Sequence, residues 1–89
     1  MQVLFNKRFL KDLAEIPSTT RTKVEKLVFK EIPFFTLNSQ IKNLEKLKGY
    51  SQYYRIRVGT YRIGLKINNN NELSFERILH RKEIYKFFP

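Results

Sequence analysis

The chain has 89 residues, and we expect residues 1–89 to fold as one domain around a single modest core. It has no cysteine and one histidine, which excludes disulfides, a thiolate nucleophile and cysteine-ligated metal, so we expect no cofactor. A formal net charge of +10 favours polyanionic partners: nucleic acid, an anionic membrane surface or an acidic protein. No apolar run approaches the ~20 residues of a membrane span, so we expect a cytoplasmic protein with no membrane partner.

The N-terminal part predicts a short strand followed by two helices. Residues 2–5 are an apolar-rich opening strand, and Asn6 is a suitable N-cap for a helix that continues to residue 16. Pro17 ends this pattern, and Ser18 or Thr19 can cap a second helix that ends before Pro33. Because the connection is so short, the two helices should form an antiparallel hairpin. Their apolar stripes consist of Phe9, Leu10, Leu13, Ala14, Val24, Leu27 and Val28.

The central part predicts a β-hairpin. The spacing of apolar residues in 41–47 fits either a helical turn or an irregular approach to a strand, and we leave it open. Residues 53–58 and 61–67 alternate between apolar and polar side chains, and Gly59-Thr60 suits a two-residue turn between them. With the apolar residues on one face, the expected register pairs Val58 with Tyr61, Arg57 with Arg62, Ile56 with Ile63 and Arg55 with Gly64.

The C-terminal part predicts one more strand and a helical tail. Asparagine tolerates left-handed turn conformations, so residues 68–71 read as a loop that leads into a strand over residues 73–79. Residues 82–87 form the tail. The fold class is therefore α+β, with the order β-α-α-β-β-β-α: a small, mostly antiparallel sheet backed by an N-terminal helical hairpin.

Positive charge is concentrated on the predicted β-hairpin. Residues 42–66 contain seven basic residues and one acid, Glu45. The register places Arg57 opposite Arg62, an arrangement that destabilises a sheet unless an anion lies between the two charges. The planar guanidinium group matches phosphate oxygens, so a phosphate would relieve the repulsion. Alternatively, Glu76 on the next strand reaches across to the Arg57–Arg62 pair and neutralises it, although one carboxylate cannot balance the charges of Arg55, Arg57 and Arg62 together.

The groups that could move a proton near neutral pH, apart from lysine, are the only histidine and the tyrosines. His80 and Tyr85 lie five residues apart in a basic segment. The chain has no glycine-rich nucleotide loop and no paired carboxylate spacing. An enzyme with this composition would act on phosphate without a metal ion. That chemistry fits a ribonuclease in which the 2′-hydroxyl of the RNA attacks the neighbouring phosphate.

Three segments carry a resemblance to a known family: Lys46-Leu47-Lys48-Gly49, the run from Tyr54 to Ile63, and Leu79-His80-Arg81-Lys82-Glu83-Ile84-Tyr85. Together they resemble toxins of the RelE/ParE superfamily, over essentially the whole chain. The resemblance implies the toxin of a type II toxin–antitoxin pair. RelE-like members cut mRNA in the ribosomal A site, whereas ParE-like members share the fold, poison DNA gyrase and lack the nuclease residues.

Site residues follow from the resemblance by position. Arg55 and Arg57 fall where RelE-like toxins carry basic residues, commonly lysine, and Arg62 falls on the arginine that holds the scissile phosphate. A lysine base is excluded at these positions, which leaves Tyr85 or His80, and surrounding positive charge favours the forms that a base needs. The predicted catalytic set is Arg55, Arg57, Arg62, His80, Arg81 and Tyr85, and the predicted RNA contacts are Lys46, Lys48, Tyr53, Lys66 and Lys82.

The complete set favours a RelE-like mRNA interferase, with the ribosome, mRNA and a neutralising antitoxin as partners. We expect the antitoxin to lay an amphipathic segment on the sheet or on the helical hairpin. Two alternatives remain open: a ParE-like gyrase inhibitor and a basic RNA-binding module without catalytic activity.

Overall fold

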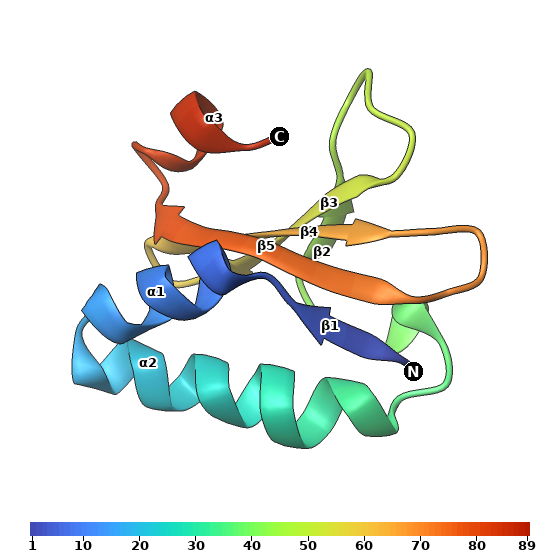
Figure 1. Ribbon diagram of the computed structural model, residues 1–89, viewed down its shortest axis with the longest axis horizontal. Helices are drawn as coiled ribbons and strands as arrows, with labels where there is room; N and C mark the ends of the chain where they lie inside the picture. The colour runs from blue at the N-terminus through green and yellow to red at the C-terminus, as the bar shows by residue number, and fades with distance from the viewer.

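The computed structural model describes residues 1–89, which form one five-stranded sheet with helices on both faces (Figure 1). The elements in chain order are β1 (Val3–Phe5), α1 (Lys7–Glu15), α2 (Ser18–Glu25), a π-helical turn (Lys26–Glu31), 3₁₀ turns (Ile32–Phe34 and Asn38–Gln40), β2 (Leu44–Lys46), β3 (Tyr53–Val58), β4 (Tyr61–Ile67), β5 (Leu73–His80) and α3 (Ile84–Phe87). The α+β prediction is confirmed. Helices α1 and α2 lie under the sheet, and α3 lies above it (Figure 1).

The strand order is β1-β5-β4-β3-β2, with β1 parallel to β5 and the other neighbours antiparallel. The predicted register of the central hairpin is confirmed, because Val58 pairs with Tyr61 and Arg57 with Arg62. Gly59 in the turn has φ +60°, a left-handed conformation that glycine adopts without steric cost. The hairpin therefore needs its glycine to keep this register.

One strand is absent from the sequence prediction. The order β-α-α-β-β-β-α lacks β2, whose three residues pair with the outer edge of β3. Three residues are too few to show an alternating pattern, so the strand forms because β3 offers a free edge. Bonds on either side extend the pairing, from Arg57 N to Asn43 O at 3.3 Å and from Leu47 N to Tyr53 O at 2.9 Å.

The helical hairpin differs from prediction at three points. Asn6 caps α1 as expected, since its side chain accepts a bond from Arg8 N at 2.9 Å, but Leu10 is 42% exposed and Ala14 is exposed as well. The N-cap of α2 is Pro17, so the helix begins at Ser18 instead of following a Ser18 or Thr19 cap. After Glu25 the helical path continues as the π-helical turn and then as the 3₁₀ turn that ends at Phe34. Pro33 is tolerated in the first turn of this 3₁₀ segment because its missing N–H would have no partner there.

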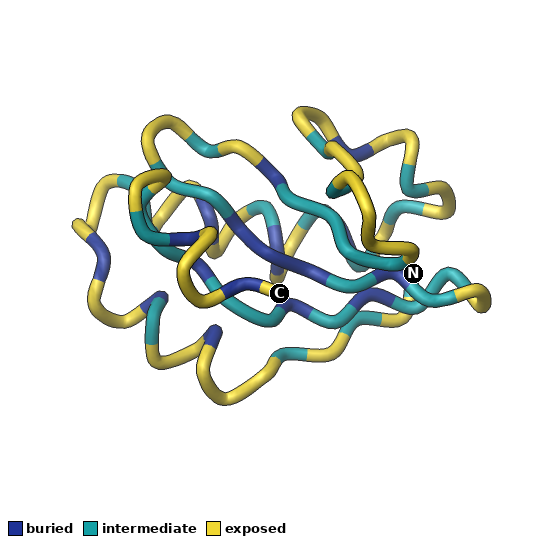
Figure 2. Tube along the Cα trace, turned by 90° about the horizontal axis from the view of Figure 1, so that it is seen from above, coloured by how far each residue is buried: buried dark blue, intermediate teal, exposed yellow.

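The hydrophobic core lies between the helical hairpin and the lower face of the sheet. In Figure 2 the buried stretches follow the central strands, and the loops around them are exposed. None of the helices is long and apolar enough to cross a membrane. The core cluster is Phe9, Leu13, Ile16, Val24, Val28, Ile32, Ile41, Ile56, Ile63, Leu65, Ile67, Leu73, Phe75 and Ile78.

Helix α1 covers the edge of β5 beyond the point where β1 ends. The carboxylate of Asp12 accepts bonds from Arg77 Nε at 2.7 Å, from Arg77 Nη2 at 3.2 Å and from the backbone N–H of Ile78 at 3.1 Å. Both side chains are mostly buried, and the bond to Asp12 raises the pKa of Arg77. One carboxylate thus satisfies an edge donor and holds an arginine in place.

We predict that Asp12→Ala lowers the free energy of unfolding by about 3 kcal/mol, because it leaves a buried guanidinium and a strand N–H without a partner. Urea unfolding followed by circular dichroism measures the change. Glu83→Gln, which removes only the exposed pair with Lys86, serves as the control and should change stability by less than about 1 kcal/mol. An equal effect of both substitutions would contradict the role of Asp12.

Candidate active site

The upper face of the sheet, opposite the helical hairpin, carries three arginines from the central hairpin. Arg57 and Arg62 are direct partners in the ladder, and Arg55 lies two residues along β3 on the same face. We call this surface the arginine face. Strand alternation positions these three side chains, and the same alternation sends Ile56 and Ile63 into the core. The local folding that builds the core therefore also gathers the charges.

The counter-ion of the arginine face is Glu45. Strand β2 places Glu45 opposite Arg55, and Arg55 Nη2 donates to Glu45 Oε2 at 2.8 Å. This hydrogen bond, and then the charge of Arg55, lower the pKa of Glu45. The alternative role for Glu76 is wrong, since the carboxylate of Glu76 accepts a hydrogen bond from Ser74 on its own strand. One carboxylate therefore faces three guanidinium groups, and the face keeps a net positive charge.

Arg62 is the most constrained of the three arginines. Its Nη1 donates to the backbone carbonyls of Gly59 at 2.9 Å and Tyr61 at 3.0 Å, which fixes the guanidinium at the turn of the hairpin. Burial, followed by the charges of the neighbouring arginines, lowers its pKa. The guanidinium stays protonated in water nonetheless. Arg62 is thus a cation held in a fixed position. It has further N–H donors and cationic neighbours, so an anion bound there would be stabilised.

Tyr85 comes from α3, thirty residues further along the chain than Arg55, and reaches the same face. Arg55 Nη1 donates a hydrogen bond to the Tyr85 hydroxyl oxygen, and the guanidinium carbon lies 5.7 Å from the centre of the ring. The side chain remains 53% exposed. The structure therefore brings a phenol and three arginines onto one accessible surface.

His80 lies apart from this group. The ladder pairs His80 with Tyr61, and Arg62 with Leu79, so alternation places the imidazole on the helical-hairpin face. Its ring meets the Tyr61 ring edge-on at 5.7 Å, and its Nδ1 accepts a bond from Lys82 N at 3.1 Å. No hydrogen bond joins it to the arginines or to Tyr85.

Arg81 lies in the turn between β5 and α3. Its backbone N–H donates to Thr60 O at 2.8 Å, which ties this turn to the turn of the central hairpin. Its side chain is exposed, and its charge contributes to the lowered pKa of Arg62. Arg81 therefore adds a fourth positive charge near the end of the arginine face.

The predicted RNA contacts fall into two groups. Tyr53 and Lys66 are ladder partners on the arginine face, with Lys66 Nζ 5.8 Å from the centre of the Tyr53 ring. Lys46 pairs with Tyr54 and so belongs to the opposite face, Lys48 lies in the loop after β2, and Lys82 is exposed beside His80. The lysines at 46, 48 and 82 thus do not belong to the arginine face.

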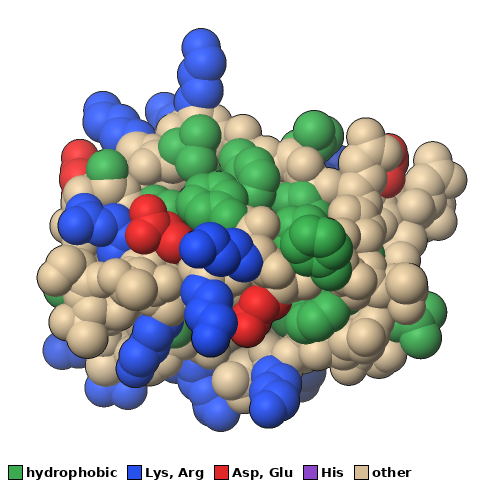
Figure 3. Space-filling model, turned by 90° about the horizontal axis from the view of Figure 1, so that it is seen from below, with side chains coloured by type: hydrophobic (Ala, Val, Ile, Leu, Met, Phe, Trp, Pro, Cys, Tyr) green, Lys and Arg blue, Asp and Glu red, His purple; other side chains and the backbone are tan.

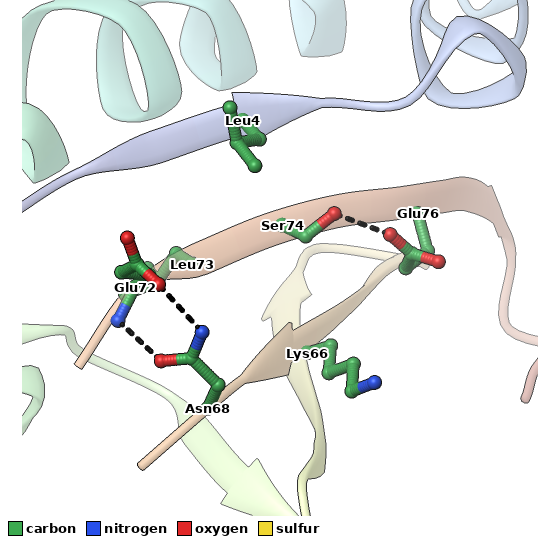
Figure 4. Close-up of a pocket in the computed structure, with 7 residues that line it drawn as sticks. All are labelled: Leu4, Lys66, Asn68, Glu72, Leu73, Ser74 and Glu76. Carbon is green, nitrogen blue, oxygen red and sulfur yellow. Dashed lines mark hydrogen bonds between the residues drawn. The ribbon is translucent and has the colours of Figure 1, made fainter. Parts of the chain in front are cut away.

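The arginines lie on an open surface. A hollow of about 310 Å³ opens near the far end of β4 and β5, and its lining residues include neither an arginine nor Tyr85 (Figure 4). Its two carboxylates already have partners, Glu72 in Asn68 and Glu76 in Ser74. No group of three or more His, Cys, Asp or Glu side chains is arranged to hold a metal ion.

Two residues that shape the site are absent from the sequence prediction. Glu45 is the only acid among seven basic residues, which marks it as their counter-ion once its strand is known. Gly64 is a glycine inside a strand, a position that often marks close approach of another segment. In the structure the ring of Phe88 lies directly over Gly64.

The fold matches that of solved toxins. The toxin–antitoxin complex RelB-RelE from Methanococcus jannaschii contains a chain that aligns with a TM-score of 0.79 and 42% identity, over 97% of this chain and 99% of that one. The isolated RelE toxin of E. coli shares the fold, with a TM-score of 0.66 at 20% identity over 96% of this chain and 90% of that one. The architecture is that of a RelE-type toxin.

Sequence comparison leads to the same group. The family described as "ParE toxin of type II toxin-antitoxin system, parDE" matches residues 3–85. Toxin RelE3 of Methanocaldococcus jannaschii is 44% identical over 89 residues, the full length of both chains. The chain therefore belongs to the RelE/ParE superfamily of toxins of type II toxin–antitoxin systems, as the sequence motifs predict.

We predict that Glu45 titrates below the ordinary range of a glutamate and that Arg55→Gln returns its pKa toward that range. Because the folded-state pKa is lowered, the stabilisation by Glu45 is present above its unfolded pKa and is lost as the pH falls through the folded value. An NMR titration of the Glu45 carboxyl carbon measures both values. Lys46→Gln removes a neighbouring charge from the opposite face and is the control. An equal shift in both variants would rule out the specific pair.

Proposed function

We propose that this toxin is a metal-independent endoribonuclease that cleaves mRNA in the ribosomal A site and so inhibits translation. The observation that carries the proposal is the union of Arg55, Arg57, Arg62 and Tyr85 on one accessible face. A phosphate between Arg57 and Arg62 would turn a repulsive pair into two charge-assisted contacts. The free protein therefore pre-arranges its cations for a phosphate at that position.

The proposed reaction uses the RNA as its own nucleophile. The 2′-hydroxyl loses its proton to the base as its oxygen bonds to phosphorus, the bond from phosphorus to the 5′ oxygen breaks, and that oxygen takes up a proton from solvent water. The products are a 2′,3′-cyclic phosphate and a free 5′-hydroxyl. Negative charge builds on the non-bridging oxygens at the transition state, where Arg62 and Arg57 would stabilise it.

Tyr85 is the proposed base. Arg55 donates to the oxygen of Tyr85 and would stabilise its phenolate, the form that can take the proton of the 2′-hydroxyl. Its exposure lets a substrate approach from solvent. His80 faces away from the arginines, which assigns it a structural role beside Tyr61 in this proposal.

An open face cannot by itself hold a nucleotide in one orientation. An in-line attack requires the sugar and the phosphate in one geometry, and such positioning is worth about 7–11 kcal/mol. The arginine face offers cations without an enclosing pocket. A preformed site on the ribosome would supply the missing constraint, and the peripheral lysines would contact ribosomal RNA.

A ParE-like gyrase inhibitor is the second candidate, favoured by the description of the matching family. The two candidates differ in their need for the arginine face. Cleavage requires its phosphate contacts and the phenol, whereas gyrase poisoning requires neither. The third candidate, an RNA-binding module without catalysis, would bind RNA through the same charges and leave the chain intact.

We predict that the purified protein cleaves a defined mRNA in a programmed ribosome far faster than the same mRNA free in solution. Arg62→Ala should slow ribosomal cleavage about 10²–10³-fold, because it removes a positioned donor from the transition state. Circular dichroism and thermal unfolding check that the variant remains folded. The matched control is Lys23→Ala, which removes one exposed charge from α2.

Three results would contradict the proposal. Equal rates on free and ribosome-bound mRNA would indicate a free-standing ribonuclease. Intact mRNA together with inhibition of gyrase supercoiling would move the protein to the ParE-like class. Wild-type cleavage by a folded Arg62→Ala protein would remove this residue from the mechanism.

The proposed antitoxin site lies on the helical side. Apolar side chains gather there between basic and acidic side chains (Figure 3). A groove of about 550 Å³ is lined by Leu27, Phe34 and Phe35, with Lys30, Glu31, Gln40 and Lys42 also in its wall. We propose that the cognate antitoxin lays an amphipathic segment here, with acidic groups toward the lysines. The RelB-bound relatives support a partner of this kind.

We predict that Phe34→Ser weakens binding of the cognate antitoxin at least tenfold, because Phe34 is 81% exposed on the groove and would anchor the segment. Leu4→Ser, which removes an exposed apolar residue outside the groove, is the control. Surface plasmon resonance at several salt concentrations should also show association slowing as ionic strength rises. Unchanged affinity of the Phe34 variant would exclude the groove.

A further inference from the structure

We infer that Gly64 and Phe88 form a lock that holds the C-terminal segment on the sheet and so positions Tyr85 for catalysis. The inference rests on the proposed function and assigns to it two positioning residues that do not touch the substrate. Its basis is one row of the ladder, across the middle of the upper face.

Gly64 on β4 pairs with Arg55 on β3 and with Arg77 on β5. Each member of this row contacts a different residue of the C-terminal segment. Arg55 bonds to Tyr85, Gly64 lies under Phe88, and the Arg77 guanidinium lies 5.5 Å from the ring centre of Phe87. One row of the sheet thus receives the whole segment.

The contact at the centre of the row permits only glycine. A Cβ atom at position 64 would lie 2.6 Å from two ring carbons of Phe88, closer than such atoms approach in folded proteins. Phe88 is 4% exposed, and its ring meets Tyr53 edge-on at 5.6 Å. In the view from above, the C-terminus lies over the middle of the sheet (Figure 2). Phe88 is therefore a buried anchor beyond the end of α3.

The start of the C-terminal segment is held by contacts that do not involve Phe88. Arg81 N bonds to Thr60 O, and Ile84 is fully buried. Helix α3 spans only four residues, and so short a helix has no stability of its own in water. The position of Tyr85, between the two anchors, depends on both of them. A shift of about 1 Å in a reacting group can cost 10²-fold in rate.

The two arginines of this row are also held by carboxylates within the body of the protein. Arg77 is held by the carboxylate of Asp12, and Arg55 by that of Glu45. Both arginines therefore have partners outside the C-terminal segment. The row then acts as a preformed template, and Gly64 is the place where the segment comes closest to the backbone.

The first experiment tests the lock in the free protein, without RNA. In wild type, the Phe88 ring should shift the Gly64 proton resonances upfield, and Phe88→Ala should abolish this shift. The Lys86 and Phe88 amides, which bond to Glu83 and Ile84, should exchange faster while core amides in β4 keep their protection. Lys86→Ala, on the exposed side of the same helix, is the control. Unchanged Gly64 resonances and exchange in Phe88→Ala would overturn the lock.

The second experiment tests positioning, with cleavage of mRNA in programmed ribosomes. Phe88→Ala should lower kcat about 10–10²-fold and leave KM within about twofold, because the arginines that bind phosphate are unchanged. In a Tyr85→Phe background the same substitution should cost little more, since the hydroxyl that it misplaces is already absent. Additive losses in the double variant would reject positioning and indicate a general structural effect.

The role of Gly64 is tested by the same comparison of single and double variants. Gly64→Ala should lower kcat like Phe88→Ala, and should have little further effect when the Phe88 ring has been removed. Equal damage by Gly64→Ala in both backgrounds would overturn the assignment of Gly64. A wild-type protein that leaves ribosomal mRNA intact would instead overturn the proposed function itself, and with it the role of Tyr85 that the lock serves.

Discussion

Gly59 adopts a left-handed conformation, which limits the turn between β3 and β4 to two residues and sets their register. From this register follow the pairing of Arg57 with Arg62, the burial of Ile56 beside Ile63, and the place of Gly64 next to Arg55. A shift of one residue would send the arginines into the core. The packing energy of the lower face therefore holds together a cluster of like charges on the upper face.

The concentration of positive charge works against stability in the free protein, and the structure shows how it is contained. Glu45 neutralises Arg55, and the backbone carbonyls of Gly59 and Tyr61 receive the guanidinium of Arg62. Arg57 is exposed to solvent, where water screens its charge. The remaining imbalance is what an anionic ligand would remove. A surface of this kind is expected where binding, and not folding, is the purpose of the charges.

The two sides of the sheet carry different features of the structure. The helical hairpin closes the core from below and leaves an apolar groove at Phe34. The C-terminal segment packs on the upper face and carries Tyr85 to the arginines. In the functions proposed above, the antitoxin and the RNA would contact different surfaces. The lock at Gly64 then concerns the RNA surface alone, and it links the last residues of the chain to the middle of the sheet.

The alternation of residues 53–67 by itself determined the central hairpin, its register and the gathering of three arginines on one face, because period-two patterning and a two-residue turn are local properties. Leu10, by contrast, fits a helical stripe and is nevertheless exposed, and the strand around Glu45 is too short to show a pattern. The face on which His80 lies depends on a register shift between β4 and β5, and the ring of Phe88 lies over Gly64, so both were decided only by tertiary structure. Both depend on contacts between residues distant in the chain, and local spacing carries no information about such contacts.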